Sequence, residues 1–451
     1  MSLLLSDLNF DILKYICGWL KDISKLNLIT ICKKLLNLDV TFDEKYDFYE
    51  ILRSSFYDNY TNISIGNTIF CINVTMANGC KIEWPKKISR LTLNSDFVKN
   101  LEKDLLPSSI VELKFSDSYD GSLFDYVPSS VKKLILGSDF RLSTADNIPS
   151  SVEHLRIMED NEKTKRMNRI PIPSHIKHLY VKKLNTVTVS SSVTHLYFSS
   201  YTRDQKNYYG KYIPTSVTHI TIYGNETIDN DKYLIPTSVT HLTIRKNMFT
   251  PNYKYLIPIS VTHLTFKNSF NGSIDKSIPP SVEYLIFGNG FNQPIRKSIP
   301  INVKSLVFGN KFNQRIDNYL PISLTHLTLG DDFNQSIKRL PSSITHLTFG
   351  TNFNKIITNR IPNSVIYLTF GALFNNSIKD GIPSSVTHLI FGKFFNQPVN
   401  DYIPSTVKYI VFGEKFNYPI KDNISSGVKM ISIYNKNYSH ELLPHVCKII
   451  T

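Results

Sequence analysis

A unit of about 21 residues recurs along most of this chain. From Pro258 it reads P-I-S-V-T-H-L-T-F-K-N-S-F-N-G-S-I-D-K-S-I, and from Pro279 it reads P-P-S-V-E-Y-L-I-F-G-N-G-F-N-Q-P-I-R-K-S-I. The pattern returns from Pro300, Pro321, Pro341, Pro362, Pro383 and Pro404. A fixed period of this length is typical of a solenoid, in which each unit packs only against its neighbours.

Apolar residues within one unit predict a short strand. Counting the proline as position 0, apolar side chains occur at positions 3, 6 and 8, which are Val261, Leu264 and Phe266 in the first example. Positions 6 and 8 follow a period of two, so His263 and Thr265 between them should face outward. The rest of the unit is too short for a long helix, and position 15 is proline in three units. We therefore expect an extended or turn-like return leg.

Stacking of the units is required because no single unit can bury its own apolar residues. The stacked strands should form a parallel sheet that grows by about 4.8 Å per unit. The spacing V-x-x-L-x-F resembles the strand segment L-x-x-L-x-L of leucine-rich repeats, which implies a curved solenoid with strands on its concave side. Seventeen units begin near Pro85, Pro107, Pro128, Pro149, Pro173, Ser190, Pro214, Pro236, Pro258, Pro279, Pro300, Pro321, Pro341, Pro362, Pro383, Pro404 and Ser425.

Several positions of the unit form columns of one residue type. Phe at position 12 should form a buried spine, and Asn at position 13 can bond the backbone at a turn. Gly at position 9 fits either a positive φ or a close backbone approach. Nine of the twelve histidines occupy position 5: His154, His178, His195, His219, His241, His263, His326, His346 and His388.

The histidine column has two interpretations. Imidazole is a common metal ligand, so stacked histidines could bind metal. However, Tyr284, Ser305, Tyr367 and Tyr409 interrupt the column, and a metal site would be local rather than copied along the chain. We therefore favour a structural or surface-lining column and expect neither a metal nor another cofactor.

The first 45 residues do not follow the repeat. Ile12, Ile16 and Leu20 recur every four residues, which is typical of an amphipathic helix, and Ser24 can cap a second helix. The simpler interpretation of this helical module is a cap that covers the first unit of the solenoid. The alternative is a docking module for another protein.

A resemblance to known families adds to this interpretation. Leu8, Asp11, Ile12, Leu13, Ile16, Leu20, Leu26, Ile31, Cys32 and Lys33 resemble the F-box pattern L-P-x-E-[IL]-L-x-x-I-L-x-x-L…L…V-C-[KR], with Asn9 where that family usually has Pro. The recurring V-T-H-L-x-F-G-x-x-F-N-x-x-I is similar to FNIP repeats. Proteins that combine the two are an expanded family in amoebae and in the large DNA viruses that infect them.

The resemblance implies a substrate-recognition adaptor of a cullin-type ubiquitin ligase. The F-box-like segment would dock on a Skp-type adaptor protein of the cullin complex, and the solenoid would bind a target protein. The candidate adaptor-binding residues are Leu8, Ile12, Leu13, Ile16, Leu20 and Leu26. The alternative is a non-enzymatic interaction solenoid whose helical head is only a structural cap.

The expected fold class is α+β. An F-box-like helical module occupies residues 1–45, and a connector with an N-terminal cap follows at 46–84. A leucine-rich-repeat-like parallel β solenoid then occupies 85–430, and a C-terminal cap occupies 431–451. Two longer steps break the period, and their insertions at 159–169 and from Tyr201 should form loops.

The early units differ most from one another and thus offer a surface on which a target could be recognised. Their outward positions carry charged and aromatic side chains, and both insertions fall in the same region, so we expect the target to bind at about residues 110–225. The candidate target-binding residues are Lys133, Arg156, Tyr180, Lys182, Tyr197 and Tyr223.

Composition and motifs exclude several classes of function. No phosphate loop G-x-x-x-x-G-K, no H-E-x-x-H and no G-x-S-x-G occurs, so we expect no catalytic residues and no enzymatic activity. The net charge of +14 could indicate nucleic acid, but no run of five basic residues occurs, so a nucleic-acid partner is disfavoured. Five cysteines without a paired framework, no signal peptide and no long apolar run favour a cytoplasmic protein (host cytoplasm if viral), neither secreted nor in a membrane.

Overall fold

The structure is a computed structural model of the 451-residue chain. It divides into two compact units, residues 1–196 and 197–451, which are described separately. The structure describes residues 46–47, 62–64, 84, 86–93, 106–115, 126–137, 148–158, 169–200, 213–223, 235–245, 257–267, 269–275, 277–420, 424–425, 427–439 and 448–450.

Parallel strands form the sheet of the first compact unit. Within it β2 pairs with β1 and β3, and β3 through β6 and then β8 follow in order. A separate pair, β7 with β9, lies outside this sheet. The strands are β1 (Tyr46–Asp47), β2 (Asn62–Ser64), β3 (Arg90–Leu93), β4 (Glu112–Phe115), β5 (Lys133–Leu136), β6 (His154–Ile157), β7 (Ile170–Pro171), β8 (His178–Lys183) and β9 (Val187–Thr188). The next strand, β10 (His195–Ser200), begins in the last two residues of this unit and ends in the second unit.

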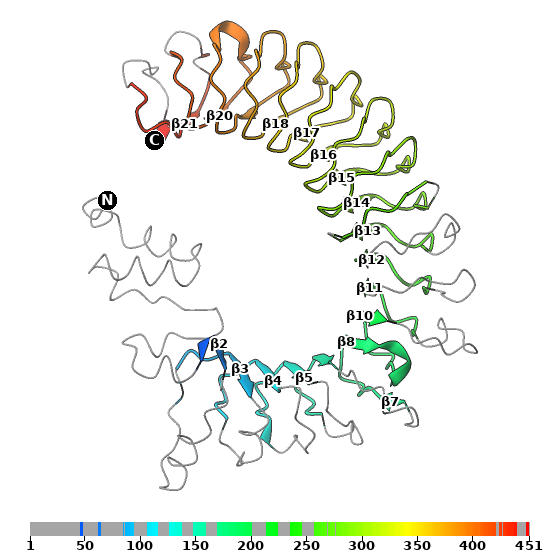
Figure 1. The fold of residues 1–451 in the computed structure, drawn as a ribbon. Coiled ribbons are helices and arrows are strands. Elements are labelled where there is room, and N and C mark those ends of the chain that lie inside the picture. Colours follow the sequence, from blue (N-terminus) through cyan, green and yellow to red (C-terminus); the bar gives the residue numbers. More distant parts are fainter. Residues whose placement is uncertain are drawn as a thin grey trace. The chain divides into compact units, whose positions relative to one another are not determined.

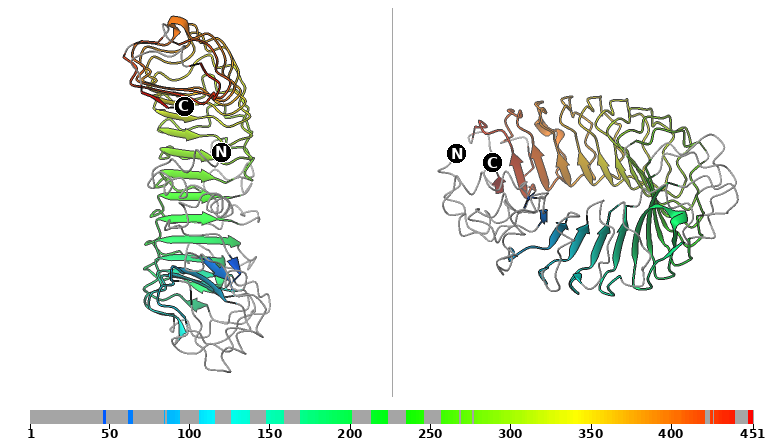
Figure 2. Two further views of the ribbon diagram at one scale, coloured as in Figure 1. Left: turned by 90° about the vertical axis from the view of Figure 1, so that its left-hand side faces the viewer. Right: turned by 60° about the horizontal axis from the view of Figure 1, so that its bottom comes forward.

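The second compact unit continues the same pattern with parallel pairing from β11 to β22. Figure 2 shows its green strands side by side in the left view and its orange strands side by side in the right view, and in Figure 1 the strands follow one another along the inner side of the second unit's stack of repeats. They are β11 (His219–Ile222), β12 (His241–Ile244), β13 (His263–Phe266), β14 (Tyr284–Phe287), β15 (Ser305–Val307), β16 (His326–Thr328), β17 (His346–Thr348), β18 (Tyr367–Thr369), β19 (His388–Ile390), β20 (Tyr409–Phe412), β21 (Met430–Ile433) and β22 (Lys448–Ile450).

The strands occur where the period predicts them. Each of the seventeen expected units contributes a strand that begins at position 5. In β13 the burial alternates, with His263 and Thr265 partly exposed and Leu264 and Phe266 buried. Pairing joins equal positions of neighbouring units, as in His263 with Tyr284 and Leu264 with Leu285. The predicted solenoid and its inward-facing positions are therefore confirmed.

The expected α+β class is wrong for the described structure. The described residues form a parallel β solenoid, and their only helices are the three-residue 3₁₀ segments η6 (Leu184–Thr186) and η8 (Asn400–Tyr402). The helices of that class were expected at residues 1–45, whereas each described unit consists of a short strand and a return leg of turns. The predicted helical module at 1–45 lies outside the described residues, as do the two insertions except for Arg169. The predicted domain boundaries stay predictions.

Phenylalanine rings form a continuous buried spine in the second compact unit. The position-12 rings of successive units stack with centroids 5.9–6.2 Å apart, from Phe270 to Phe416. Each also stacks on the position-8 ring of its own unit where that residue is Phe, as Phe349 does on Phe353 at 3.9 Å. Tyr438 continues the spine beyond Phe416, with centroids 6.0 Å apart.

Side-chain hydrogen bonds join each unit to the next. The Oδ1 of Asn313 accepts the backbone N–H of Asn334 at 3.0 Å, and the same bond repeats from Asn271 to Asn417. On another edge, hydroxyls at position 2 donate to the carbonyl at position 3 of the preceding unit, as Ser343 does to Leu324 O at 2.7 Å. These ladders satisfy backbone groups that turns would otherwise leave unpaired.

The glycine column results from close backbone packing. A methyl group on Gly350 would overlap the carbonyl oxygen of Gly330, and the same overlap repeats at Gly309, Gly371, Gly392 and Gly413. Positive φ occurs instead near position 18, for example at Asn318 (60°) and Asp380 (54°), where Asn and Asp tolerate the left-handed conformation. The glycines at position 9 are therefore required by the close approach of neighbouring backbones and not by a positive φ.

We predict that Phe353→Ala lowers the free energy of unfolding by about 3–5 kcal/mol, because the side chain is fully buried between neighbouring rings. Urea denaturation followed by circular dichroism would measure the loss. Ile356→Ala, at a site in the same unit that is 68% exposed, is the matched control and should change stability little. Equal effects of the two substitutions would contradict the buried spine.

We also predict that Gly350→Ala destabilises the solenoid by about 1–3 kcal/mol or more, because the backbone of the neighbouring unit must move away. Gly290→Ala is the control, because the equivalent position 11 of the next unit accommodates the side chain of Lys311. Thermal melts of both variants and the wild type would compare them. A stable Gly350→Ala protein would argue against this packing.

Candidate functional site

The exposed sheet face of the second compact unit is the candidate functional site. We define it as positions 5 and 7 of β11 to β20. None of its residues carries an Asp, Glu, Lys or Arg side chain. Its members are His219, Thr221, His241, Thr243, His263, Thr265, Tyr284, Ile286, Ser305, Val307, His326, Thr328, His346, Thr348, Tyr367, Thr369, His388, Ile390, Tyr409 and Val411.

Aromatic rings at position 5 stack from strand to strand. The centroids of His241 and His263 lie 4.0 Å apart, and those of His263 and Tyr284 lie 4.3 Å apart. A second run joins His326, His346, Tyr367, His388 and Tyr409 at 4.1–4.5 Å. Ser305 separates the two runs. The stacking follows from equal-position pairing, which places the same side chain directly above its copy in the next unit.

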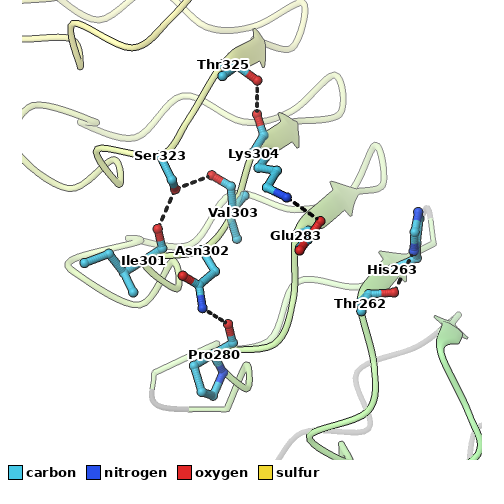
Figure 3. A network of polar contacts seen from close by, with 10 residues as sticks. All are labelled: Thr262, His263, Pro280, Glu283, Ile301, Asn302, Val303, Lys304, Ser323 and Thr325. Atoms are coloured by element: carbon cyan, nitrogen blue, oxygen red, sulfur yellow. Dashed lines mark hydrogen bonds and ion pairs between the residues drawn. The ribbon is translucent and has the colours of Figure 1, made fainter.

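Threonine at position 4 fixes the protonation pattern of the stacked imidazoles. Thr325 Oγ1 donates to the carbonyl oxygen of Lys304 at 3.0 Å, a bond drawn in Figure 3, and lies 2.9 Å from Nδ1 of His326. Because a carbonyl can only accept, the hydroxyl proton is used there, and the neutral imidazole must donate its Nδ1–H to Oγ1. Thr345 and His346 repeat the arrangement at 3.2 and 2.9 Å.

The consequence is a pair of hydrogen-bond acceptors on the exposed sheet face. With the proton on Nδ1, Nε2 of neutral His326 and His346 carries a lone pair. Within the described residues, neither Nε2 atom has a hydrogen-bond partner. The face therefore presents imidazole acceptors, threonine hydroxyls and apolar side chains to a partner.

The geometry does not favour metal binding by the stacked rings. The planes of His326 and His346 are nearly parallel, with an interplanar angle of 12°. Each Nε2 lone pair lies in its own ring plane, so the two lone pairs run side by side and do not converge on one ion. Among the residues that the structure describes, no group of three or more His, Cys, Asp or Glu side chains could hold a metal ion.

Partial burial lowers the pKa of several column histidines below the ordinary 6.5. Burial is the only cause at His241 and His388, whereas His263 has burial as the main cause and the neighbouring His241 as a further one. At His346 burial comes first, followed by repulsion from His326 and His388. Glu283 acts in the opposite direction on His263. These four lowered pKa values favour the neutral imidazole at pH 7.

An ion pair flanks the exposed sheet face where the histidine column is interrupted. Figure 3 shows Lys304 and Glu283 at position 4 of adjacent units, with Nζ and Oε2 2.8 Å apart. The carboxylate raises the pKa of Lys304. Such an exposed pair contributes little to stability, but it keeps the charge beside the face balanced.

Four of the predicted target-binding residues lie on the sheet of the first compact unit, where each already has an intramolecular partner. Lys133 Nζ lies 2.9 Å from Oε2 of Glu112 on the adjacent strand. The guanidinium of Arg156 lies 4.1 Å from the ring centroid of Tyr180 on β8. Lys182 is partly exposed at the end of β8. The structure brings Arg156 and Tyr180 together, and their role in target binding stays a prediction.

The remaining predicted residues fall elsewhere. Tyr197 and Tyr223 belong to the second compact unit, where the guanidinium of Arg245 lies 5.2 Å from the ring centroid of Tyr223. The adaptor-binding candidates, Leu8, Ile12, Leu13, Ile16, Leu20 and Leu26, lie outside the described residues.

Sequence reasoning missed the exposed apolar members of the face. Tyr284, Ile286, Tyr367 and Ile390 are 40–42% exposed although they belong to strands. Their signal was present in the sequence, because apolar residues at positions 5 and 7 must point away from the core. Because positions 5 and 7 vary little in the later units, the sequence favoured the variable early units as the binding surface.

Comparisons with known proteins agree with the fold. A family model described as "FNIP Repeat" matches residues 82–118, 254–290, 291–332, 333–372 and 374–415, which confirms the predicted resemblance to these repeats. No curated protein matches the chain significantly. Within the described residues, no helix has the length and apolar character needed to cross a membrane.

Two solved structures show different degrees of similarity. "CroV588 a novel circular LRR protein structure" has a TM-score of 0.62 and 28% identity, and the match covers 92% of this chain and 66% of that chain. The present chain thus spans slightly less than two thirds of that relative's length. YopM from Yersinia enterocolitica WA-314 has a TM-score of 0.33 and 14% identity, and the match covers 82% of this chain and 88% of that chain. This similarity is too low to support a conclusion about the fold. The predicted leucine-rich-repeat-like solenoid is confirmed.

We predict that the solenoid loses stability as the pH falls from about 7.5 to 5.5. The folded-state pKa of His241 and His263 lies below the unfolded value of 6.5, so the unfolded chain binds more protons in this window. Stability is therefore greatest above pH 6.5 and decreases below it. Melting temperatures across this range would measure the effect.

The chain itself supplies the control for this prediction. A variant with His241→Tyr and His263→Tyr keeps the aromatic stack, as Tyr284 does in the native column, and removes two titrating groups. Its melting temperature should fall less between pH 7.5 and 5.5 than that of the wild type. Identical pH profiles for the two proteins would remove the histidine column as the cause.

Proposed function

We propose that this chain is a non-enzymatic protein-interaction scaffold and that its exposed sheet face binds a target protein. Solenoids of this kind are suited to protein–protein interaction because their stacked units display an extended surface. The observation that carries the proposal is the uncharged, aromatic-rich face from β11 to β20, on which Tyr284, Ile286, Tyr367 and Ile390 are 40–42% exposed. Exposed apolar and tyrosine side chains grouped on one face are typical of interaction surfaces.

The chemistry of the face defines the kind of partner. Nε2 atoms of His326 and His346 are available to accept hydrogen bonds, and no Asp, Glu, Lys or Arg side chain occurs at positions 5 and 7. A partner therefore needs N–H or O–H donors between apolar side chains, with few charges at the centre of the contact. Charged groups at the centre would lose hydration without gaining an opposite charge.

The test compares proteins captured by the wild-type chain with those captured by a face variant. Ile286→Asp with Ile390→Asp places two carboxylates on the face, whereas Ile259→Asp with Ile322→Asp places two on isoleucines at position 1, which are 78% and 77% exposed. We expect bound proteins from an amoebal lysate to fall about tenfold with the face variant only. The lysate follows from the sequence resemblance to amoebal F-box and FNIP-repeat proteins.

Quantitative mass spectrometry of the captured proteins would measure this difference, after circular dichroism has shown that both variants fold. An equal loss with the position-1 variant would mean that added negative charge, rather than the face, reduces capture. Unchanged capture by the face variant would move the binding site elsewhere on the chain.

A more specific form of the proposal is that of a ubiquitin-ligase adaptor. Its support is the F-box-like sequence pattern in residues 5–40 together with the FNIP repeats, whose family model matches five segments. In this role the first segment would bind a Skp-type adaptor of a cullin complex, and the solenoid would bind the protein that receives ubiquitin.

Co-purification with a purified Skp-type adaptor tests the adaptor role. We expect the wild-type chain to bind and Ile16→Asp to lose binding by at least about tenfold, because a carboxylate would enter an apolar contact. Lys14→Ala in the same segment is the control and should bind normally. A folded wild-type chain that does not bind would leave the general scaffold function without the ligase role.

A further inference from the structure

A hollow of about 800 Å³ lies at the ends of β19, β20 and β21 in the second compact unit. Gly392 and Gly413 line it at position 9 of their units, and Tyr434 occupies the equivalent position of the following unit. We define the hollow by its lining residues, which are Ile390, Phe391, Gly392, Lys393, Val411, Gly413, Glu414, Lys415, Tyr434, Asn435, Lys436 and Asn437. Its volume is in the range of ligand sites in proteins.

One part of the lining is apolar and accessible. Ile390 is 40% exposed, Tyr434 is 62% exposed, and Val411 is partly exposed. These side chains point away from the buried core, since positions 7 and 9 lie on the outer side of the sheet. An occupant that covered them would bury apolar surface that the chain alone leaves in water.

Basic side chains form the rest of the rim, and two of them are uncompensated. Lys393 Nζ lies 2.9 Å from Oε2 of Glu414, so this lysine and the only carboxylate of the lining neutralise each other. Lys415 and Lys436 are exposed, and within the described residues neither has an ion-pair partner. They occupy the same position in adjacent units, where like charges repel and a carboxylate between them would relieve the repulsion.

We propose that this hollow binds an acidic peptide segment of a partner protein, with one or two aliphatic side chains over Ile390 and Val411 and flanking carboxylates at Lys415 and Lys436. The charge of the rim and the apolar lining together select this occupant. A nucleic acid would bring phosphates toward the Glu414 carboxylate and would leave the aliphatic residues uncovered. The inference rests on the proposed scaffold function and assigns one partner chemistry to one place.

Fluorescence anisotropy with the full chain and three labelled peptides tests the proposal. The first peptide has Leu-Ile between two glutamates on each side, the second has glutamine in place of every glutamate, and the third has serine in place of Leu-Ile. At about 50 mM salt we expect the first peptide to bind at least about tenfold more tightly than either of the others. Equal binding of the serine peptide would reduce the contact to non-specific attraction by a basic protein and overturn the proposal.

Matched variants locate the peptide on the chain. The double variant Lys415→Glu with Lys436→Glu should weaken binding of the first peptide at least about tenfold. The control is Lys311→Glu, which changes an exposed lysine at the same repeat position outside the hollow. It should change binding less than about twofold. Ile390→Ser should weaken binding, and Ile286→Ser should not, although Ile286 has the same repeat position and a similar exposed fraction of 42%. Equal effects within either pair would overturn the assignment to the hollow.

Further outcomes distinguish the peptide proposal from a nucleic-acid site and from the proposed scaffold function. If a labelled single-stranded RNA bound more tightly than the first peptide and lost binding with the Lys415→Glu and Lys436→Glu variant, the hollow would be a nucleic-acid site and the peptide proposal would be wrong. If no peptide bound while target capture still depended on Ile286 and Ile390, only the assignment to the hollow would fail. Peptide binding without face-dependent capture would instead support the hollow and contradict the docking face.

Discussion

Contact between equal positions of neighbouring units is the constraint on which the rest of this structure depends. Phe353 is fully buried only because Phe333 and Phe374 lie on either side of it, with centroids 6.1 Å away. The amide ladder from Asn271 to Asn417 imposes the same alignment on the backbone. Each unit thus obtains both its apolar core and its hydrogen-bond partners from its neighbours, so repetition at nearly constant length is a physical requirement of the fold.

The same alignment determines what the exposed side can offer. Once equal positions pair, every outward residue faces a copy of itself, and charged columns would repel along their whole length. Tyrosine and threonine carry no charge, partial burial lowers the pKa of His241, His263, His346 and His388, and these side chains can stack or hydrogen-bond. Beside the face, Glu283 and Lys304 of adjacent units have opposite charges and form an ion pair. An uncharged binding surface is therefore a consequence of the stacking as well as a feature suited to a partner.

Departures from the repeat create the individual sites. Ser305 interrupts the ring column, and Tyr434 takes the position that glycine holds in Gly392 and Gly413. This change, together with Lys415 and Lys436, distinguishes the end of β19 to β21 from the other described units. A regular solenoid gives a uniform surface, so recognition of one partner at one place requires such local differences.

The sequence by itself determined the repeat, the strand at positions 5 to 8, the buried Phe spine and the outward direction of the histidines, because these follow from a period of 21 and an alternation of two. It did not determine the class correctly, since the described residues contain no helix longer than three residues. Only the tertiary structure showed that Gly350 is required by the backbone of Gly330, that Thr325 fixes the tautomer of His326, and that a hollow forms beside Tyr434. Each of these depends on atoms about 20 residues apart in sequence, whose distance is set by the stacking of units rather than by any local pattern.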